Sequence, residues 1–500
     1  MTSPYFYPMD NRIEKKDDRA SAPLRALRGF FLSPAFMLLS ALVASTSAAF
    51  GEAHTMTGIV INAQLFGLAL LVCDDFAAAM TPFLTVMCQG ATLFTNWDVI
   101  LPYIIPWGFL PAAGLLFHLI VYRKPLRNGI SLWGLIAASS AILLGGLGAS
   151  NVASPLASAT NAFYYFGLSF GLLLLYFLFS SHYKRPKNYD PYEFFLWQML
   201  FTGLVCAFIL WHTLLTFTDG DFDFVEFRNA TAFRNSLSNI MIMGLPAPFY
   251  FSAKKKLPLV GKLLSFALGL FVYLSLCLTT SRTAILFGSL LFLLCLVYYF
   301  ARRSDLLPKL LNASILSVSL FFFLALLPRL LTIFDTEAIT AFFQNLPHSL
   351  LEINLTEARF ELFFRAIEDF LAHPLFGVGF LSPINGDVYT PFQGCIVWYH
   401  LYFPQIFGSM GLVGIAAYTL LLGTRARLMF FRPDARSTAI SLTALSLFLY
   451  SMTDPGEFMP IPFGMMAVLA FVLLERHAEA HPDGFFVAYP QKSKKTIDKK

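Results

Sequence analysis

The sequence predicts an all-α polytopic membrane protein of about 12–14 transmembrane helices, with one large extracytoplasmic loop that contains an amphipathic helix. Hydrophobic residues make up 57% of the 500 residues, charged residues make up 13%, and the mean hydropathy is +0.64. A soluble protein of this size has about 45–50% apolar and about 25% charged residues. The apolar residues also form long runs rather than the short alternating segments of a membrane barrel.

Each transmembrane helix needs about 20 apolar residues, and the chain contains fourteen such runs. The runs at 76–95 and 237–252 are the weakest, because they contain Pro82 and Gln89, or Pro246 and Pro248. The fourteen runs lie near residues 32–50, 56–73, 76–95, 101–122, 130–150, 162–181, 194–216, 237–252, 258–279, 284–301, 309–331, 399–423, 437–453 and 458–475.

The N-terminal stretch does not resemble a secretory signal peptide, because its basic part is long and no small-residue cleavage pattern interrupts the first apolar run. We expect a cytoplasmic leader followed by a retained helix. The predicted domains are a leader at 1–30, an N-terminal transmembrane bundle at 31–236, a core at 237–430 that includes an extracytoplasmic loop at 332–398, C-terminal transmembrane helices at 431–476, and a basic cytoplasmic tail at 477–500.

The basic residues predict the orientation of these helices. Threading the runs alternately places all fifteen lysines on one side of the membrane, together with both termini. The positive-inside rule assigns that side to the cytoplasm. The basic loops on it lie at 123–127, 184–187, 254–262, 302–309 and 425–436.

Six basic residues lie on the opposite side, and all of them are arginines. A guanidinium binds phosphate through two parallel hydrogen bonds, a geometry that the lysine ammonium lacks. The set therefore favours a phosphate-bearing ligand outside the cytoplasm; the alternative is that each arginine pairs with a neighbouring carboxylate. The six are Arg228, Arg234, Arg282, Arg329, Arg359 and Arg365.

No cofactor is indicated. The cytoplasmic loops contain no nucleotide fingerprint and no glycine-rich phosphate loop, so we expect no ATP-driven chemistry and no nucleic-acid partner. Asp219, Asp221 and Asp223 alternate as calcium ligands do, but Phe224 and Ala230 occupy positions where an EF-hand needs Gly and Glu. We expect a solvated acidic loop and no metal. Five of the six cysteines lie in or beside apolar runs, where Cys packs as a small hydrophobe: Cys73, Cys88, Cys206, Cys277 and Cys295.

Among the outer arginines, Arg282 has the position where a charge is most costly. It lies in Thr-Thr-Ser-Arg-Thr at 279–283, between two apolar runs with almost no loop. A charge at the edge of the hydrocarbon is costly unless it is paired or meets head groups. We favour contact with the phosphate of a lipid-linked substrate over simple snorkelling to the interface. Arg228 and Arg234 lie near the start of a short predicted helix, where backbone N–H groups also attract anions.

The large outer loop is predicted to contain a helix that begins at Asn354, with Glu357 completing a capping box. Arg365 projects opposite the apolar face, beside acidic residues, which favours a salt bridge. Arg359 flanks the apolar face and is the better site candidate. The helix must end before Pro374. The apolar face comprises Phe360, Phe363, Phe364, Ile367, Phe370 and Leu371, and the acids near Arg365 are Glu361, Glu368 and Asp369.

Beyond this helix, Gly377 and Gly379 permit a tight turn of the backbone. His400 lies where the loop re-enters the membrane, and Gln405 follows on the next predicted helix. A histidine can act as a general base near neutral pH. The alternative is a hydrogen-bonded histidine at the membrane interface.

Three of these segments together resemble the O-antigen ligase and polymerase superfamily over about residues 237–430. Leu401 replaces an Asn of the family pattern, and fourteen runs exceed the twelve spans commonly described for it. The three segments are Thr-Ser-Arg-Thr-Ala at 280–284, Arg359 with the helix that leads to His-Pro-Leu-Phe-Gly-Val-Gly-Phe at 373–380, and His-Leu-Tyr-Phe-Pro-Gln at 400–405 followed by Gly-Leu-Val-Gly at 411–414.

The resemblance implies a metal-independent glycosyltransferase on the periplasmic face of a bacterial inner membrane. Its donor would be a glycan on undecaprenyl pyrophosphate, and its acceptor lipid A-core, another lipid-linked repeat or a protein hydroxyl. Arg282 and Arg359 would hold the pyrophosphate, and His400 would position or deprotonate the acceptor hydroxyl. Membrane lipids are further partners. The residues assigned to substrate binding are Arg228, Arg234, Gln405 and His373.

A transporter or flippase of polysaccharide or lipid-linked glycan is the main alternative. An ion-coupled transporter usually carries buried charges in mid-span positions, and the sequence shows no such Asp, Glu or Lys. A non-catalytic assembly partner is a third possibility. The shared residues act on the donor, so the sequence leaves ligase and polymerase open.

Overall fold

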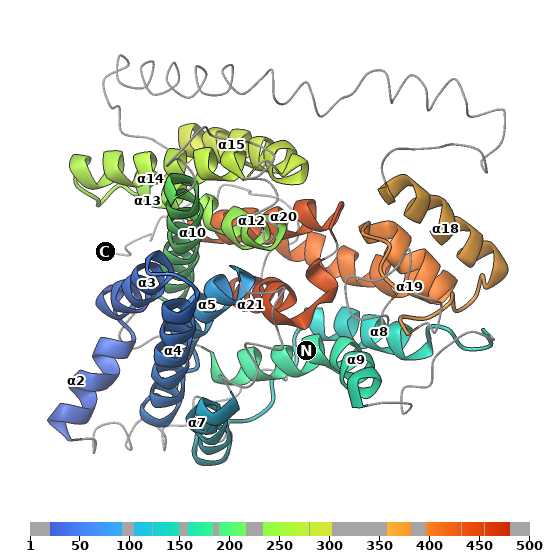
Figure 1. Cartoon of the computed structure of the whole chain (residues 1–500), viewed down its shortest axis with the longest axis horizontal. Coiled ribbons are helices and arrows are strands. Elements are labelled where there is room, and N and C mark those ends of the chain that lie inside the picture. Colours follow the sequence, from blue (N-terminus) through green and yellow to red (C-terminus); the bar gives the residue numbers. More distant parts are fainter. Residues whose placement is uncertain are drawn as a thin grey trace, which may run out of the picture. The chain divides into compact units, whose positions relative to one another are not determined.

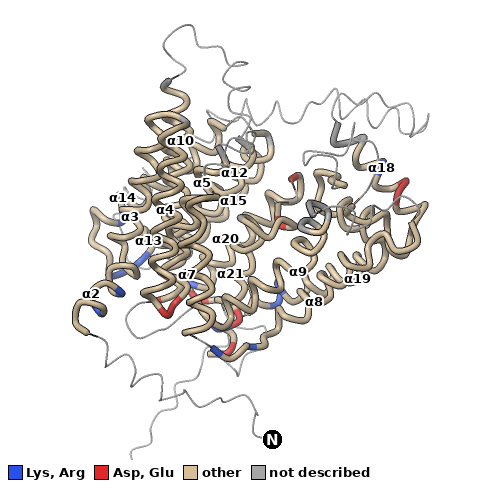
Figure 2. The backbone as a smooth tube through the Cα atoms, turned by 60° about the horizontal axis from the view of Figure 1, so that its bottom comes forward, with Lys and Arg blue, Asp and Glu red and all other residues tan. Residues whose placement is uncertain are grey.

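The computed structural model describes residues 21–92, 105–122, 124–149, 159–183, 190–216, 234–279, 281–302, 358–381, 397–431, 433–454 and 456–480. Within these ranges the regular elements are all helices and no β-strand occurs (Figure 1). Charged residues are sparse along the described backbone (Figure 2). The predicted all-α class is therefore confirmed.

Six described helices are long and apolar enough to cross a membrane. A seventh results if the first two helices, which meet at a bend of 58°, are counted as one broken span. The chain is thus a multi-pass membrane protein; the larger count of 12–14 spans stays a prediction, and the apolar run at 309–331 lies outside the described residues. The six spans are Ala53–Val72, Tyr165–His182, Pro191–Leu215, Leu259–Leu278, Thr283–Ala301 and Tyr402–Met429.

The chain divides into two compact units, of which the first comprises Met1–Lys124 and His182–Tyr189. Its helices are held together by buried hydroxyl and amide groups, as is usual between membrane helices. The Ser40 hydroxyl bonds to Asn62 Oδ1 at 2.7 Å and to the Thr85 hydroxyl at 2.8 Å, which links three helices. The elements are α2 (Ala22–Phe31), α3 (Pro34–Ala49), α4 (Glu52–Val72), α5 (Ala77–Thr92), η1 (Ile105–Trp107) and α7 (Phe109–Val121).

The second unit comprises Pro125–Ser181 and Asp190–Lys500. This division follows packing, and the predicted boundary at 236/237 remains a prediction. Its elements are α8 (Ile130–Leu144), α9 (Ala159–His182, whose last residue belongs to the first unit), α10 (Pro191–Thr216), α12 (Arg234–Gly244), α13 (Pro246–Ala253), α14 (Leu259–Leu278), α15 (Arg282–Arg302), α18 (Ala358–Ala372), α19 (Tyr402–Met429), α20 (Ala435–Ser451), η2 (Gly456–Phe458), η3 (Pro460–Gly464) and α21 (Met465–Glu479).

The predicted run at 237–252 is not one helix but two. Helix α12 ends at Gly244 and α13 begins at Pro246, because proline lacks the N–H that would continue the helix but suits a first helical turn. Nearly every side chain from Leu237 to Ser252 is buried. The break therefore lies inside the protein, where other groups can satisfy the freed backbone.

One end of the second unit gathers several helix ends that were predicted to face the cytoplasm. Lys254, after α13, bonds to Glu193 at the start of α10 at 2.7 Å. The Tyr298 hydroxyl, near the end of α15, donates to Ala435 O at the start of α20 at 2.9 Å. The loops that share this side in the predicted topology thus lie together in the structure.

Asp434 caps α20 at this same end. Its carboxylate accepts from Ser437 N at 2.7 Å, and the Ser437 hydroxyl accepts from Asp434 N at 2.9 Å, which completes a capping box. Burial acts to raise the pKa of Asp434, but the hydrogen bonds from Ser437 outweigh it and hold that pKa below its usual range.

Helix α19 contains the decisive irregularity of the fold. Gly411 adopts φ 61° and ψ −150°, which interrupts the helix. The rings of Tyr402 and Tyr418 lie 6.2 Å apart, so the arm at 402–410 folds back along the arm at 412–429. The longer arm alone reaches about 27 Å at 1.5 Å per residue. The span predicted near 399–423 thus corresponds to the candidate span Tyr402–Met429, with a break at Gly411 that the apolar run does not reveal.

The backbone that follows α18 fills this break. Leu412 N donates to Pro374 O at 2.8 Å, and Val413 N donates to Leu375 O at 3.2 Å. These bonds satisfy the N-terminal end of the longer arm. A break leaves unpaired donors and acceptors on both sides, and none of them tolerates burial without a partner.

The same segment also satisfies the C-terminal end of the shorter arm. Val378 N donates to Gly408 O, and Gly379 N donates to Ser409 O, both at 2.9 Å. We call residues 374–379 the capping segment. Helix α18 ends at Ala372, before Pro374, as predicted.

Glycines permit this close approach. Gly377 and Gly379 adopt φ 62° and 82°, which confirms the predicted turn. A β-carbon at Gly411 would lie 2.5 Å from Leu375 C and 2.6 Å from Pro374 O. Such distances are shorter than any real contact, so a side chain at Gly411 would push the capping segment out of the break.

Two acidic residues of the second unit are buried. Glu457, in η2, is 4% exposed and pairs with Arg425 of α19. Glu475, in α21, is 5% exposed and accepts a hydrogen bond from the Tyr176 hydroxyl at 3.1 Å. Both acids lie at or beyond the ends of the predicted apolar run at 458–475, so the expected absence of mid-span Asp, Glu and Lys stays a prediction. Arg425, which was predicted to lie in a basic loop, is buried instead. A buried charge of this kind requires a partner, and both acids have one.

Gly411→Ala should destabilise the protein by about 2–5 kcal/mol, because it adds backbone strain and a clash with the capping segment. Thermal unfolding in detergent micelles measures this. Gly423→Ala is the matched control in the same helix: a β-carbon there meets no atom within 4 Å, so it should be neutral or stabilise by up to about 1 kcal/mol. Equal stability of the two variants would contradict the capping role.

Candidate functional site

The start of α15 places Arg282 at a helix N-terminus. Helix α14 ends at Leu278 and α15 begins at Arg282, so the connection is as short as predicted. The Ser281 hydroxyl accepts from Ala284 N at 3.5 Å, and the Thr279 hydroxyl donates to Leu276 O at 2.6 Å. Both polar side chains thus serve the two helix ends and leave the turn compact.

Two hydrogen bonds join the C-terminal end of α20, which was predicted to face outward, to the starts of two other helices. The Thr283 and Thr453 hydroxyls bond at 2.7 Å, and the Tyr450 hydroxyl donates to Asn235 O at 2.9 Å. The structure therefore brings the first residues of α12 and α15 to the same end of the unit. Those first residues are Arg234 and Arg282.

The loop that carries His400 reaches the same place. Tyr402 N bonds to Met452 O at 3.4 Å, next to Thr453. His400 is half-buried and has a φ of 55°, which makes it the one described non-glycine residue with a positive φ. This conformation is uncommon and costs about 1–2 kcal/mol for an L-residue. Backbone strain of this kind often marks a functional position.

Gln405 has a different place from the one predicted. It is fully buried, and its side-chain oxygen accepts from Tyr399 N at 2.9 Å. Its amide nitrogen donates to Val397 O at 3.0 Å and to the Ser409 hydroxyl at 2.8 Å. Both ends of the amide thus bind the protein itself. The geometry favours a role in holding the His400 loop over the predicted contact with substrate.

Arg365 pairs with acidic residues of its own helix, as predicted. Its guanidinium lies 3.2 Å from Asp369 and 3.5 Å from Glu368. The Asp369 carboxylate is 6% exposed and also accepts from the Tyr399 hydroxyl at 2.7 Å. Sequence reasoning treated Asp369 only as a surface partner of Arg365, and it gave Tyr399 no role.

The buried face of α18 differs from the predicted apolar stripe. Leu362 and Ala366 form a buried cluster with Val397 and Tyr399, whereas Leu371, which was assigned to the stripe, is 71% exposed. The helix lies beside α19 (Figure 1) and packs on the loop that precedes His400, so its inward face is set by these contacts. Apolar spacing alone does not identify the partner of a helix.

The remaining candidates are placed as follows. Arg359 belongs to α18, one turn before the buried Leu362, and only the backbone is described for Arg234, Arg282 and Arg359. His373 is half-buried directly after α18, and its carbonyl accepts from Gly377 N at 2.8 Å. Other predicted features lie outside the described residues: Arg228, Arg329, the helix cap at Asn354 and Glu357, the acidic positions 219, 221 and 223, and Cys395.

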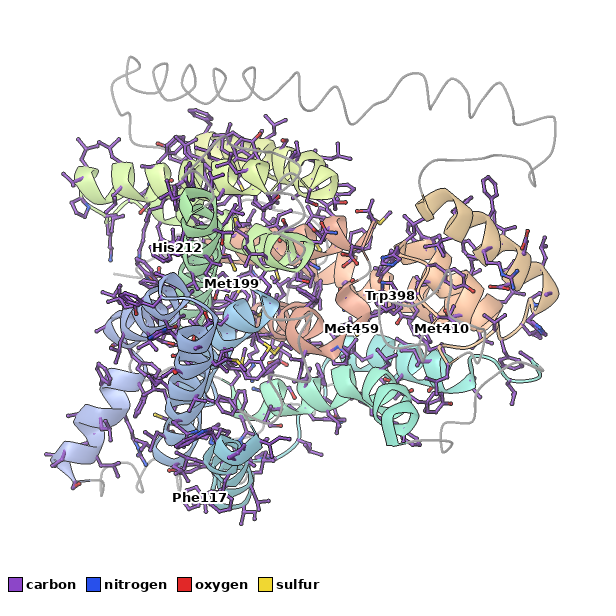
Figure 3. All side chains as sticks on the ribbon, in the orientation of Figure 1. Phe117, Met199, His212, Trp398, Met410 and Met459 are labelled. Atoms are coloured by element: carbon purple, nitrogen blue, oxygen red, sulfur yellow. The ribbon has the colours of Figure 1, made fainter. Side chains whose placement is uncertain are left out.

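Two labelled side chains beside this loop, Trp398 and Met410, lie in the interior (Figure 3). Trp398 is 3% exposed and Met410, directly before the break in α19, is fully buried. Within the described ranges, no group of three or more His, Cys, Asp or Glu side chains is arranged to hold a metal ion. The five cysteines of the apolar runs are all buried as thiols.

These observations define a class of protein: a multi-pass helical membrane protein in which arginine-bearing helix ends and a strained histidine meet at one end of the bundle. A comparison with protein families then finds a match between residues 265–419 and the O-antigen ligase family. This match supports the resemblance: residues 265–419 are similar to the O-antigen ligase domain of a family of glycan-ligating membrane enzymes. The matched residues include α15, α18 and the His400 loop. A search of curated proteins found no match.

The strain at His400 predicts an unusual order of stability. Glycine adopts a positive φ without cost, so His400→Gly should be more stable than His400→Ala by about 1 kcal/mol. Thermal unfolding in detergent checks this. His212, inside α10 (Figure 3), is the matched control: there Ala should be the more stable replacement by about 1 kcal/mol, because glycine weakens a helix. If the Ala variant were the more stable one at both positions, the proposed strain at His400 would be contradicted.

Proposed function

We propose that this protein is a membrane glycosyltransferase that moves or polymerises a glycan on the periplasmic face. The donor is a glycan on undecaprenyl pyrophosphate, and the acceptor is a hydroxyl of lipid A-core or of another saccharide. The observation that supports this proposal is the meeting of three segments at the outer end of α20: the starts of α12 and α15 and the loop that carries His400.

The arginines would act on the leaving group. Arg234 and Arg282 are the first residues of their helices, so a pyrophosphate there would meet guanidinium groups, helix N–H groups and the positive end of two helix dipoles. Arg359, on α18, would add a third guanidinium. Negative charge grows on the pyrophosphate as its bond to the sugar breaks, and fixed positive groups stabilise that charge. Departure of the pyrophosphate therefore needs no metal in this proposal.

His400 would act on the acceptor. A neutral imidazole takes the proton of the acceptor hydroxyl as the hydroxyl oxygen attacks the anomeric carbon of the donor sugar. The new glycosidic bond forms while the bond from that carbon to the pyrophosphate oxygen breaks. The proton leaves on His400, and the products are the lengthened acceptor and undecaprenyl pyrophosphate.

A transporter or flippase is the second candidate, and the buried charges support it to a limited extent. Arg425 and Glu457 are both buried, which is common along ion pathways. They pair directly with each other, however, and Arg425 also lies 5.0 Å from the centre of the Phe471 ring. A pair packed in this way serves as a structural link between α19 and η2 more readily than as a conducting site.

Single alanine substitutions of Arg282, Arg359 and His400 should each lower surface polysaccharide by at least about tenfold in a complemented deletion strain, since removing one transition-state group costs about 10²–10³ in rate. Arg282→Lys should also fail, because lysine keeps the charge but not the bidentate geometry. Gel analysis of the polysaccharide measures this. Arg436→Ala, which removes an exposed ion pair at the opposite end of α20, is the control.

Normal polymer in all three alanine variants would overturn the enzymatic proposal. If the protein were a transporter, its loss would instead leave the lipid-linked precursor on the cytoplasmic leaflet. The lipopolysaccharide of the deletion strain separates the two enzyme types: lipid A-core without any added chain indicates a ligase, and a single added repeat indicates a polymerase.

A further inference from the structure

We infer that Tyr399 and Asp369 are positioning residues for His400, and that they make its placement depend on the loop helix α18. This inference rests on the proposed role of His400. It starts from a physical requirement: a histidine at φ 55° does not hold that conformation by itself. The residues on either side must be held firmly enough to offset the strain.

The side-chain amide of Gln405 holds the backbone of the residues that precede His400. It accepts from Tyr399 N and donates to Val397 O, so the peptide groups just before His400 are bound to one buried amide. Val397 N in turn donates to Phe380 O at 2.8 Å. These contacts fix the path of the backbone, but they do not determine how the loop lies relative to α18.

Tyr399 supplies that second restraint through its side chain. The residue is fully buried, and its hydroxyl donates to the Asp369 carboxylate at 2.7 Å. Its ring lies directly on Gly408, where a β-carbon would meet the ring at 2.7 Å. The ring is therefore held between α18 and the short arm of α19, and the adjacent His400 must follow its position.

The acceptor in this bond is a carboxylate, which matters for its strength. A hydroxyl bonded to an ionised oxygen is held about twice as strongly as one bonded to a neutral group. The guanidinium of Arg365 lies 3.2 Å from the same carboxylate, so Asp369 joins Arg365 and Tyr399. These contacts run from Arg365 through Asp369 to Tyr399. They connect the exposed face of α18 to the peptide bond that precedes His400.

Helix α18 also carries Arg359, one of the proposed pyrophosphate contacts. The Tyr399–Asp369 bond therefore ties the acceptor-activating residue and a donor-binding residue to the same rigid helix. Movement of α18 on donor binding would displace both together. Loss of the bond should consequently impair the chemical step and leave donor affinity unchanged.

The test uses the full-length protein in proteoliposomes, with the polyprenyl-pyrophosphate glycan that accumulates in the deletion strain as donor. Tyr399→Phe removes only the hydroxyl and should lower kcat about tenfold with an unchanged KM for the donor. Asp369→Asn keeps an acceptor but removes the charge, and should lower kcat about threefold. The double variant should fall no further than Tyr399→Phe, because both changes remove one interaction.

Tyr298→Phe is the matched control, since it also loses one tyrosine hydroxyl bond but at the opposite end of α15. It should keep full kcat and a melting temperature similar to that of Tyr399→Phe. Full kcat in Tyr399→Phe would overturn the inference, and so would a loss of kcat in Tyr298→Phe of the same size, which would indicate general destabilisation. Full activity in His400→Ala would instead overturn the proposed function.

Discussion

The backbone of the second unit depends on one set of interactions, in which the capping segment at 374–379 fills the break in α19. Interrupted helices occur at membrane depth only where protein supplies partners for the freed N–H and C=O groups. Here four backbone hydrogen bonds do so, two on each side of Gly411. Because these bonds need direct contact between backbones, they also require the absence of side chains at Gly411 and Gly377.

This insertion determines where the functional segments lie. It anchors the end of α18 against α19, and the short arm of α19 then presents Gln405 and Gly408 to the loop that precedes the helix. The loop is bound from both directions before it reaches His400. The starts of α12 and α15 meet α20 nearby. A loop residue thus acquires the rigidity of the helices around it, which a strained conformation requires.

The sequence was sufficient for features set by local chemistry. Long apolar runs predicted most helices, Pro374 predicted the end of α18, and the spacing of Arg365 and Asp369 predicted their ion pair. It was insufficient where distant segments decide the structure. Nothing in the run around Gly411 signals that residues 374–379 enter it, and the partner of Glu457 lies thirty-two residues away along the chain. Predicting the packed face of α18 likewise required knowing what packs against it.

Gln405 shows how the structure bears on the interpretation of a motif residue. When only the sequence is considered, a polar residue five positions after a candidate histidine suggests substrate contact. In the structure, however, the Gln405 amide forms hydrogen bonds with Tyr399, Val397 and Ser409. A buried amide with all its bonds inside the protein would lose them if it turned to a ligand. At the described helix starts of α12 and α15, by contrast, the first N–H groups have no partner in their own helix, and such ends attract anions. Gln405 therefore supports the loop that carries His400 through bonds that all lie inside the protein.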